Sequence, residues 1–288
     1  MQKNFKILKN NFTAWLYLLP FIILYVLFMI YPLIRGIILS LYSKTLFTGY
    51  QFVGLHNYSF ILSDPMFIQD IFNVFYFTVA TILIYTFLSL IIAVIFNRKG
   101  LIAYIMRSFI VAPMVLSVTV IGIIWELTTT IGPGNEIIKL LFGRNISIST
   151  NPQLAMWVII MATLWWTLGS DVIIFLAGLQ SISQEYYEAA KLDGASRIKI
   201  FFSITLPLLR PIIIVVIVLQ TVASLQLFGQ PYTITGGGPF NSTSTPLMYI
   251  YNYLNSNIGI ASAASIFLFI LMLIVSIIEI FLISKREE

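Results

Sequence analysis

Cysteine is absent from this 288-residue chain, and histidine occurs once, as His56. Without cysteine there are no disulfides, thiolate metal ligands, iron–sulfur clusters or cysteine nucleophiles, and one histidine leaves no histidine-based metal cluster. Charge is also scarce, because charged residues make up 9% of the chain, against roughly 25% in soluble domains. The sequence therefore excludes most metal and thiol chemistry, and it is neither a water-soluble domain nor a disordered chain.

Apolar residues dominate the composition, at 59% with a mean hydropathy of +0.96. A transmembrane helix needs about 20 apolar residues, and six segments of the chain satisfy that length. Runs such as 121–125 and 213–217 are apolar on every side, unlike the alternating strands of a β-barrel. The sequence therefore predicts an all-α integral membrane protein with six transmembrane helices, over 14–34, 71–96, 102–125, 154–176, 212–228 and 261–283.

Lysine and arginine are divided unequally between the two sides of these spans. Most of them lie on the side that holds both termini, and the positive-inside rule makes that side cytoplasmic. The first apolar segment is longer than a signal-peptide core, so we expect it to stay as an uncleaved helix. The predicted organisation is a cytoplasmic N-terminus (1–13), one transmembrane domain (14–283) and a cytoplasmic C-terminus (284–288).

A polar loop at 181–211 interrupts the apolar pattern between the fourth and fifth spans. Ser181 begins a possible capping box, which predicts a helix in the first half of the loop. Gly194 permits a sharp turn after it, and Asp193 is placed to cap a second short helix over 195–202, ending before the following Leu-Pro. We expect two short helices that project from the membrane.

The residues of this loop resemble a known motif. The run Glu188-Ala189-Ala190, then Asp193-Gly194-Ala195 and a later Leu-Pro, resembles the EAA loop of permease subunits of bacterial ABC importers. Segments 53–58, 175–182 and 235–239 are similar to the carbohydrate branch of that family, of the MalF/UgpA type. The resemblance covers about residues 14 to 283 and implies the type I ABC importer permease (MetI-like) fold.

The resemblance also implies a role for the loop and a set of partners. In that family the EAA loop docks on a cytoplasmic ATPase dimer, so Glu188 is expected to face a basic group, while a solvated loop without a partner is the alternative. The further partners implied are a second homologous permease, an extracytoplasmic solute-binding protein, membrane lipid and a carbohydrate, with no nucleic acid, in a bacterial cell membrane. The expected coupling residues are Glu185, Tyr187, Glu188, Ala189, Ala190, Asp193 and Gly194.

Polar side chains inside the fourth and fifth spans form two stripes. Residues 167, 170 and 171 share one helix face, as do residues 220 and 224. Hydrogen-bonding groups beside an indole suit a sugar, and the maltose-type permeases that the chain resembles place their sugar site on these helices. The alternative to substrate contact is a structural role, in which serine and threonine hydrogen-bond their own helix or a neighbouring helix. The expected substrate-path residues are Trp166, Thr167, Ser170, Asp171, Gln220, Ser224 and Leu227.

The function predicted by this resemblance is the membrane subunit of an ATP-driven ABC importer for a carbohydrate, expected to be an oligosaccharide. Permeases for glycerol-phosphate, an amino acid or a peptide are alternatives, and an ion-coupled secondary transporter is a more distant one. No GxxxxGK[ST] motif and no catalytic triad occur in the chain. We therefore expect a non-catalytic subunit without a cofactor of its own, with ATP and Mg bound by the partner ATPase.

Overall fold

The computed structural model describes residues 15–44, 49–98, 100–130, 136, 139–140 and 151–284. The expected N-terminal segment 1–13, the residues after Ser284 and most of residues 126–153, between the third and fourth predicted spans, lie outside these ranges. The chain forms two compact units, one from Met1–Ser63 with Ile250–Leu268 and one from Asp64–Tyr249 with Phe269–Glu288.

The first unit contains the first membrane span, which runs from Trp15 to Ser40, past the end expected for it. Asn57 ties the end of this span to the next segment, because its amide donates to the carbonyls of Ser40 and Tyr42 at 2.8 and 2.9 Å. The elements are η1 (Val26–Ile30), α2 (Tyr31–Ser40), β1 (Tyr42–Ser43), β2 (Gln51–Phe52) and α3 (His56–Ser63), with β1 and β2 antiparallel.

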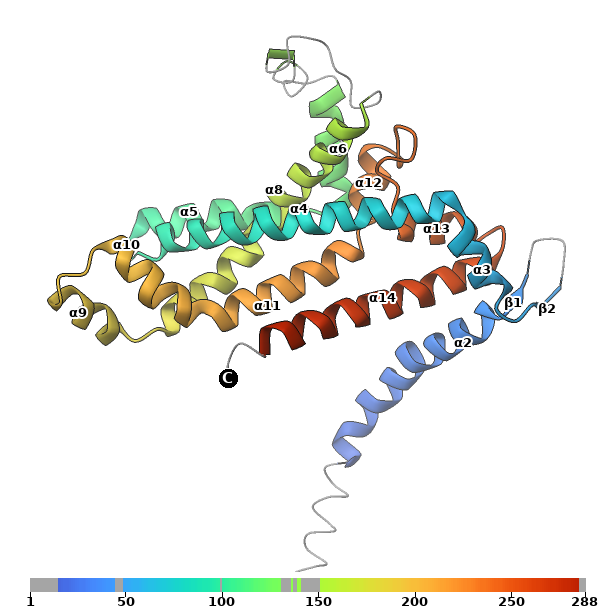
Figure 1. Cartoon of the computed structure of the whole chain (residues 1–288), viewed down its shortest axis with the longest axis horizontal. Coiled ribbons are helices and arrows are strands. Elements are labelled where there is room, and N and C mark those ends of the chain that lie inside the picture. The colour runs from blue at the N-terminus through green and yellow to red at the C-terminus, as the bar shows by residue number, and fades with distance from the viewer. Residues whose placement is uncertain are drawn as a thin grey trace, which may run out of the picture. The chain divides into compact units, whose positions relative to one another are not determined.

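The second unit is built on two long helices, α4 (Pro65–Phe96) and α8 (Pro152–Ser181). Both begin in the same way, with a side-chain cap followed by proline: Asp64 accepts from the amide of the second helical residue, and Asn151 accepts from that of the third. α4 packs along α8 and along α11 (Leu206–Leu225), as Figure 1 shows. The buried side chains between them form the apolar core of this unit.

The expected third span is a bent pair of helices rather than one straight helix. α5 (Leu101–Val111) and η2 (Ala112–Val115) meet α6 (Val118–Thr130) at 99°. Pro113 lacks an amide hydrogen and disrupts the helical ladder, and the Ser117 hydroxyl then accepts from an amide in the first turn of α6. Counting the bent pair as one span, the described residues hold six helices that are long and apolar enough to cross a membrane.

The fifth span also differs from its prediction, because helix continues without a break from Arg197 to Leu225. The second helix of the polar loop therefore does not end before Pro207. A π-helical segment, η3 (Phe201–Thr205), widens the helix just before this proline, and η1 does the same before Pro32. The remaining elements are α9 (Gln184–Leu192), α10 (Arg197–Ile200), α12 (Gly229–Ile234), α13 (Pro246–Tyr253) and α14 (Ile258–Ser284).

Candidate functional site

A cavity of about 420 Å³ lies inside the second unit, between α4, α8, α11 and the start of α12. All seven residues expected to line a substrate path line this one cavity. The structure therefore brings together the two polar stripes that helical periodicity predicted. The cavity has the size and mixed lining of a small-molecule site.

The two stripes are joined by a hydrogen bond between side chains. The Gln220 amide donates to Asp171 Oδ2 at 2.5 Å. Asp171 is 4% exposed, and of the residues that line the cavity it is the one with a charged side chain. This pair links α11 to α8 and places a carboxylate on the cavity wall, so the cavity carries a hydrogen-bond acceptor of high strength.

The hydroxyl groups of the stripes use their protons inside the protein. Thr167 donates to the Thr163 carbonyl at 2.9 Å, and Ser170 donates to the Thr167 carbonyl at 2.6 Å. Ser224 shares a hydrogen bond of 3.0 Å with Thr81 of α4. The alternative interpretation, bonding to the same or a neighbouring helix, therefore describes these bonds correctly. The hydroxyl oxygens still line the cavity and can accept from a ligand.

Trp166 has a structural task as well as a place on the cavity wall. Its indole nitrogen donates to the Leu116 carbonyl at 3.0 Å. Leu116 lies at the break between η2 and α6, where the helical ladder leaves carbonyls without their usual partners. Only the face of the indole is therefore left for a ligand.

Several lining residues were not predicted, among them Phe77, Thr163, Gln226 and Gln230. Thr163 continues the α8 stripe four residues before Thr167, so the helical period could have identified it. Gln230 lies just beyond residue 228, the end of the fifth predicted span. In the structure α12 packs against α6, and the buried side chain of Gln230 lines the cavity. No local sequence pattern predicts that Gln230 lines the cavity.

The first helix of the polar loop is α9, and its start differs from the prediction. Ser183 is the N-cap, accepting from the Glu185 amide at 3.3 Å. Ser181 does not begin a capping box, because it is the last residue of α8 and its hydroxyl donates to the Gly178 carbonyl. α8 thus extends further than the expected span and leaves the cap to the next serine.

The chain makes the expected turn after α9 at Gly194, whose φ is +71°. The Ala195 amide donates to the Ala190 carbonyl and the Gly194 amide to the Lys191 carbonyl, the two bonds of a Schellman motif. Asp193 does not cap the second helix, since Ser196 accepts from the Lys199 amide instead. After the Schellman turn, the second helix begins at Arg197 and not at residue 195.

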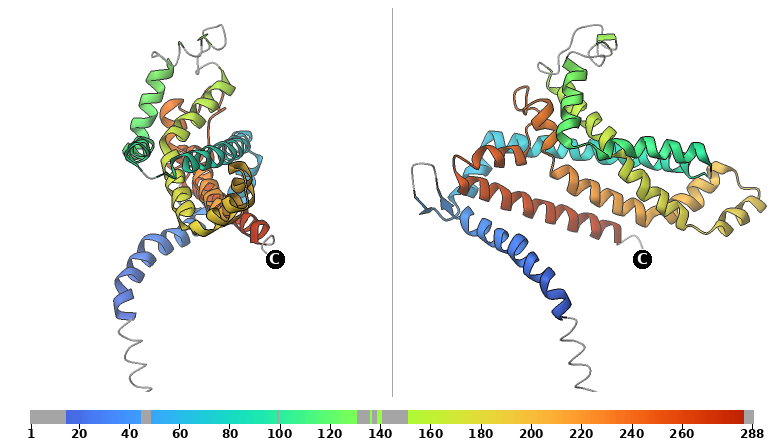
Figure 2. Two further views of the ribbon diagram at one scale, coloured as in Figure 1. Left: turned by 90° about the vertical axis from the view of Figure 1, so that its left-hand side faces the viewer. Right: turned by 180° about the vertical axis from the view of Figure 1, so that it is seen from behind.

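The remaining coupling residues lie on α9, which continues beyond the end of α8 in Figures 1 and 2. Glu185, Glu188 and Ala189 are exposed, while Ala190 is half-buried. Tyr187 is also half-buried, and its hydroxyl lies 3.3 Å from the Thr205 hydroxyl of η3. Tyr187 therefore fixes α9 against the following helix, and the glutamates and Ala189 form the outward surface.

Metal binding finds no donor set in the part of the chain that the structure describes. No group of three histidine, cysteine, aspartate or glutamate side chains is placed to hold an ion there. The site is thus a cavity with neutral hydrogen-bonding groups, one carboxylate and aromatic faces, joined by α8 and α11 to an exposed helix–turn–helix.

Comparison with known proteins identifies the family. Residues 86–286 match the family described as the binding-protein-dependent transport system inner membrane component. The chain is 35% identical to the sulfoquinovosyl glycerol transport system permease protein SmoG of Agrobacterium fabrum, over 85% of this chain and 80% of that protein. It is 34% identical to the trehalose/maltose transport system permease protein MalF of Thermococcus litoralis, over 84% and 83%.

A solved structure has the same fold. A chain of a bacterial ABC transporter involved in the import of the acidic polysaccharide alginate superposes with a TM-score of 0.85 at 22% identity, covering 99% of this chain and all of that one. The expected all-α permease fold of the MetI-like type is confirmed. The chain is a multi-pass membrane protein, and it belongs to the family of inner membrane components of binding-protein-dependent transport systems.

Proposed function

We propose that this chain is the permease subunit of an ATP-driven importer of a neutral carbohydrate, and that the central cavity is its sugar site. The observation that carries the proposal is the lining of that cavity, which includes a carboxylate, glutamine amides, hydroxyl groups and aromatic side chains, on helices long and apolar enough to cross a membrane. Polar groups inside membrane-spanning helices are normally functional. Sugar hydroxyls both donate and accept, and sugar C–H faces pack on aromatic rings.

The charge of the cavity favours a neutral sugar over an acidic one. Asp171 is a carboxylate, and the described residues that line the cavity include no lysine, arginine or histidine. An acidic sugar would face this carboxylate in a poorly solvated space, where like charges repel strongly. The same argument disfavours glycerol-phosphate, and an amino acid or peptide would leave its own carboxylate without a cation. The transporter of the acidic polysaccharide alginate shares the fold, so fold alone does not select the charge of the substrate.

Coupling to a separate ATPase is proposed for the helix–turn–helix of α9 and α10. Large apolar side chains are exposed there: Leu192 is 89% exposed, and Ile198 and Phe202 are also solvent-accessible. Exposed apolar side chains beside Glu188 and Ala189 favour burial against a partner protein over contact with water. The chain itself supplies no ATP-binding motif, so we assign hydrolysis, with its ATP and Mg, to that partner.

We infer the orientation in the membrane from the distribution of lysine and arginine. Arg98, at the end of α4, and Arg107 line the same pocket as Tyr187 of α9, so these segments meet at one end of the unit. Lys191 and Lys199 belong to the same loop. The positive-inside rule supports placing this end, and both termini, in the cytoplasm of a bacterial cell. The opposite end would then receive sugar from an extracytoplasmic solute-binding protein, beside a second permease.

The test is uptake into proteoliposomes that hold the complete transporter with its binding protein and ATP inside. The panel comprises neutral disaccharides and oligosaccharides, an acidic oligosaccharide, glycerol-phosphate and a dipeptide. The proposal predicts ATP-dependent uptake of at least one neutral sugar and none of the acidic sugar. Uptake confined to glycerol-phosphate, the dipeptide or the acidic sugar would refute it.

A further inference from the structure

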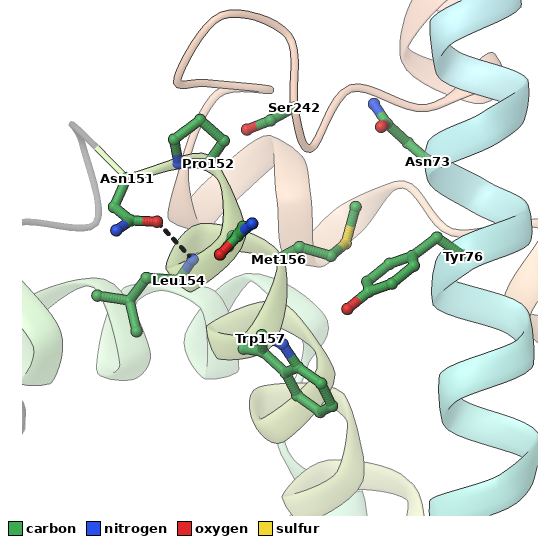
Figure 3. Close-up of a pocket in the computed structure, with 9 residues that line it drawn as sticks. Asn73, Tyr76, Asn151, Pro152, Leu154, Met156, Trp157 and Ser242 are labelled. Carbon is green, nitrogen blue, oxygen red and sulfur yellow. Dashed lines mark hydrogen bonds between the residues drawn. The ribbon is translucent and has the colours of Figure 1, made fainter.

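A second pocket, of about 660 Å³, lies at the end of the second unit where α4 and α8 begin. Figure 3 shows Tyr76 of α4 and Trp157 of α8 directed toward the same space, with Asn73 and Ser242 on its upper side. This outer pocket also includes Asn151 and Gln153, and none of the described residues that line it carries a charged side chain. It shares no lining residue with the central cavity.

Polar groups of the outer pocket lack partners within the described part of the chain. The Ser242 Oγ is buried and unbonded. No hydrogen bond there uses the Tyr76 hydroxyl, the Trp157 indole nitrogen or the Gln153 amide, and Asn151 uses only its oxygen, as cap of α8. Donors and acceptors thus line this space without hydrogen-bond partners among the described residues.

The wall opposite α8 is held rigidly. Asn73 donates to the carbonyls of Asn241 and Ser244 at 2.8 and 2.9 Å, and its oxygen accepts from Gln69 at 2.9 Å. Both amide protons of Asn73 therefore serve to fix the 241–244 loop, which carries Ser242, against α4. Asn73 is a positioning residue, and the groups available to a ligand are the unpaired ones.

The outer pocket and the central cavity lie at successive levels of the same helix faces. On α8, steps of seven residues lead from Met156 of the outer lining to Thr163 and Ser170 of the central cavity, and from Gln153 through residue 160 to Thr167. Between them lies Ile160, which is fully buried. At 1.5 Å per residue the nearest lining residues, Trp157 and Thr163, are about 9 Å apart along the helix. An apolar layer therefore separates two polar spaces.

We propose that the outer pocket is a second carbohydrate site, which binds a neutral sugar before it reaches the central cavity; this rests on the proposed import function. Two aromatic faces and unpaired neutral donors and acceptors match a polyhydroxylated ligand. A lipid phosphate is disfavoured because no cation is found among the described residues of the lining. The central cavity, with its carboxylate, and the outer pocket, without charge, would then select the same ligand twice by different chemistry.

The chain offers a matched pair of variants as a test. Trp157 and Trp165 both lie on α8 and are 39% and 40% exposed, but only Trp157 lines the outer pocket and Trp165 lines neither space. In the complete transporter, Trp157→Leu is expected to raise the KM for sugar uptake about three- to tenfold, the loss expected for one aromatic contact. Trp165→Leu should leave that KM unchanged, and Trp157→Phe, which keeps an aromatic face, should fall close to wild type.

A direct binding measurement separates this proposal from the import function. Saturation-transfer NMR with maltotriose and raffinose is performed on the complete transporter without binding protein. The inference predicts a signal in a Gln220→Leu variant of the central cavity that is reduced by adding Trp157→Leu and kept on adding Trp165→Leu. Equal signals in the two double variants, or none in either, would overturn it. Failure of wild-type uptake across the neutral panel would instead refute the import function.

Discussion

Asp171 and Gln220 are the residues that give the central cavity its chemistry. Thr167 and Ser170 donate to helix carbonyls and Ser224 shares a hydrogen bond with Thr81, so these hydroxyls offer mainly acceptor oxygens to a ligand. The carboxylate accepts one bond from Gln220 and keeps further acceptor capacity. A sugar hydroxyl that donates to this carboxylate gains a charge-assisted bond, which is roughly twice as strong as a neutral one.

Replacing Asp171 by asparagine tests this assignment, because the variant keeps the size and a hydrogen bond to residue 220 but removes the charge. Loss of about 1 kcal/mol of charge assistance predicts a KM for neutral sugar that is about fivefold higher. Ser89→Ala is the control, since Ser89 is buried in α4, bonds its own helix and lines neither pocket. Kinetics of uptake in proteoliposomes provide the measurement, and an unchanged KM in the Asp171 variant would contradict the assignment.

Trp166 carries the other residue-scale prediction. Trp166→Phe keeps a ring on the cavity wall but leaves the Leu116 carbonyl at the helix break without its donor. We expect a loss of about 1 kcal/mol of stability, measured as a lower Tm of the purified transporter. Trp165→Phe is the control, because the Trp165 indole makes no hydrogen bond among the described residues and retains its ring beside Trp125. Equal Tm values for the two variants would argue against the role given to Trp166.

At the scale of elements, the break in the third span depends on close packing with α8. Gly169 of α8 touches α5 and η2, and a Cβ there would lie 2.7 Å from the Ile110 carbonyl oxygen and 2.9 Å from the Val111 Cα. Backbone atoms cannot move aside as a flexible side chain can. The glycine therefore permits the approach that places Trp166, three residues earlier, against the break.

Gly169→Ala is thus expected to destabilise the transporter by about 1–3 kcal/mol, the cost of overpacking. Gly178→Ala is the comparison on the same helix, since its added Cβ would meet side-chain atoms of Ile212 and Leu209, at 2.9 and 3.0 Å, instead of backbone atoms. Thermal unfolding of the two purified variants compares them. A Gly178 variant that is less stable than the Gly169 variant would contradict the backbone contact as the limiting one.

Different elements were predictable to different degrees. The stripes of α8 and α11 follow from helical period alone, which is why all seven expected cavity residues meet. The glycine turn after α9 follows from local backbone preference. The break at 116–117 had a local signal in Pro113, but its angle is set by packing. Gln230 and the outer pocket depend on contacts between segments far apart in sequence, which no local pattern encodes.

At the scale of the whole molecule, α8 and α11 connect the two functional regions. Each lines the central cavity, and the loop between them forms the exposed helix–turn–helix. The contact of Tyr187 with Thr205 fixes α9 to the helix that continues into α11. A force applied at α9 would therefore move the cavity wall, provided that a partner binds the exposed surface of α9.

Glu188→Lys tests this binding, because it reverses the charge at the surface of α9 that is expected to meet a basic group of the ATPase. We expect sugar uptake and sugar-stimulated ATP hydrolysis to fall at least about tenfold, as for loss of a docked charge pair, while the subunit remains inserted. Glu126→Lys, at the far end of α6, is the control. Undiminished sugar-stimulated hydrolysis in the Glu188 variant would disprove the coupling assignment.

The central claim is that sugar passes through the cavity between α8 and α11, and its most direct test is the sugar preference of a Gln220→Leu, Ser224→Leu double variant. Uptake of two neutral sugars by the complete transporter is measured in one mixture, so that their ratio is independent of the amount of folded protein. Both residues line the cavity, so we predict slower uptake and a changed ratio. An unchanged rate and an unchanged ratio would show that these side chains serve packing, and that the sugar path lies elsewhere.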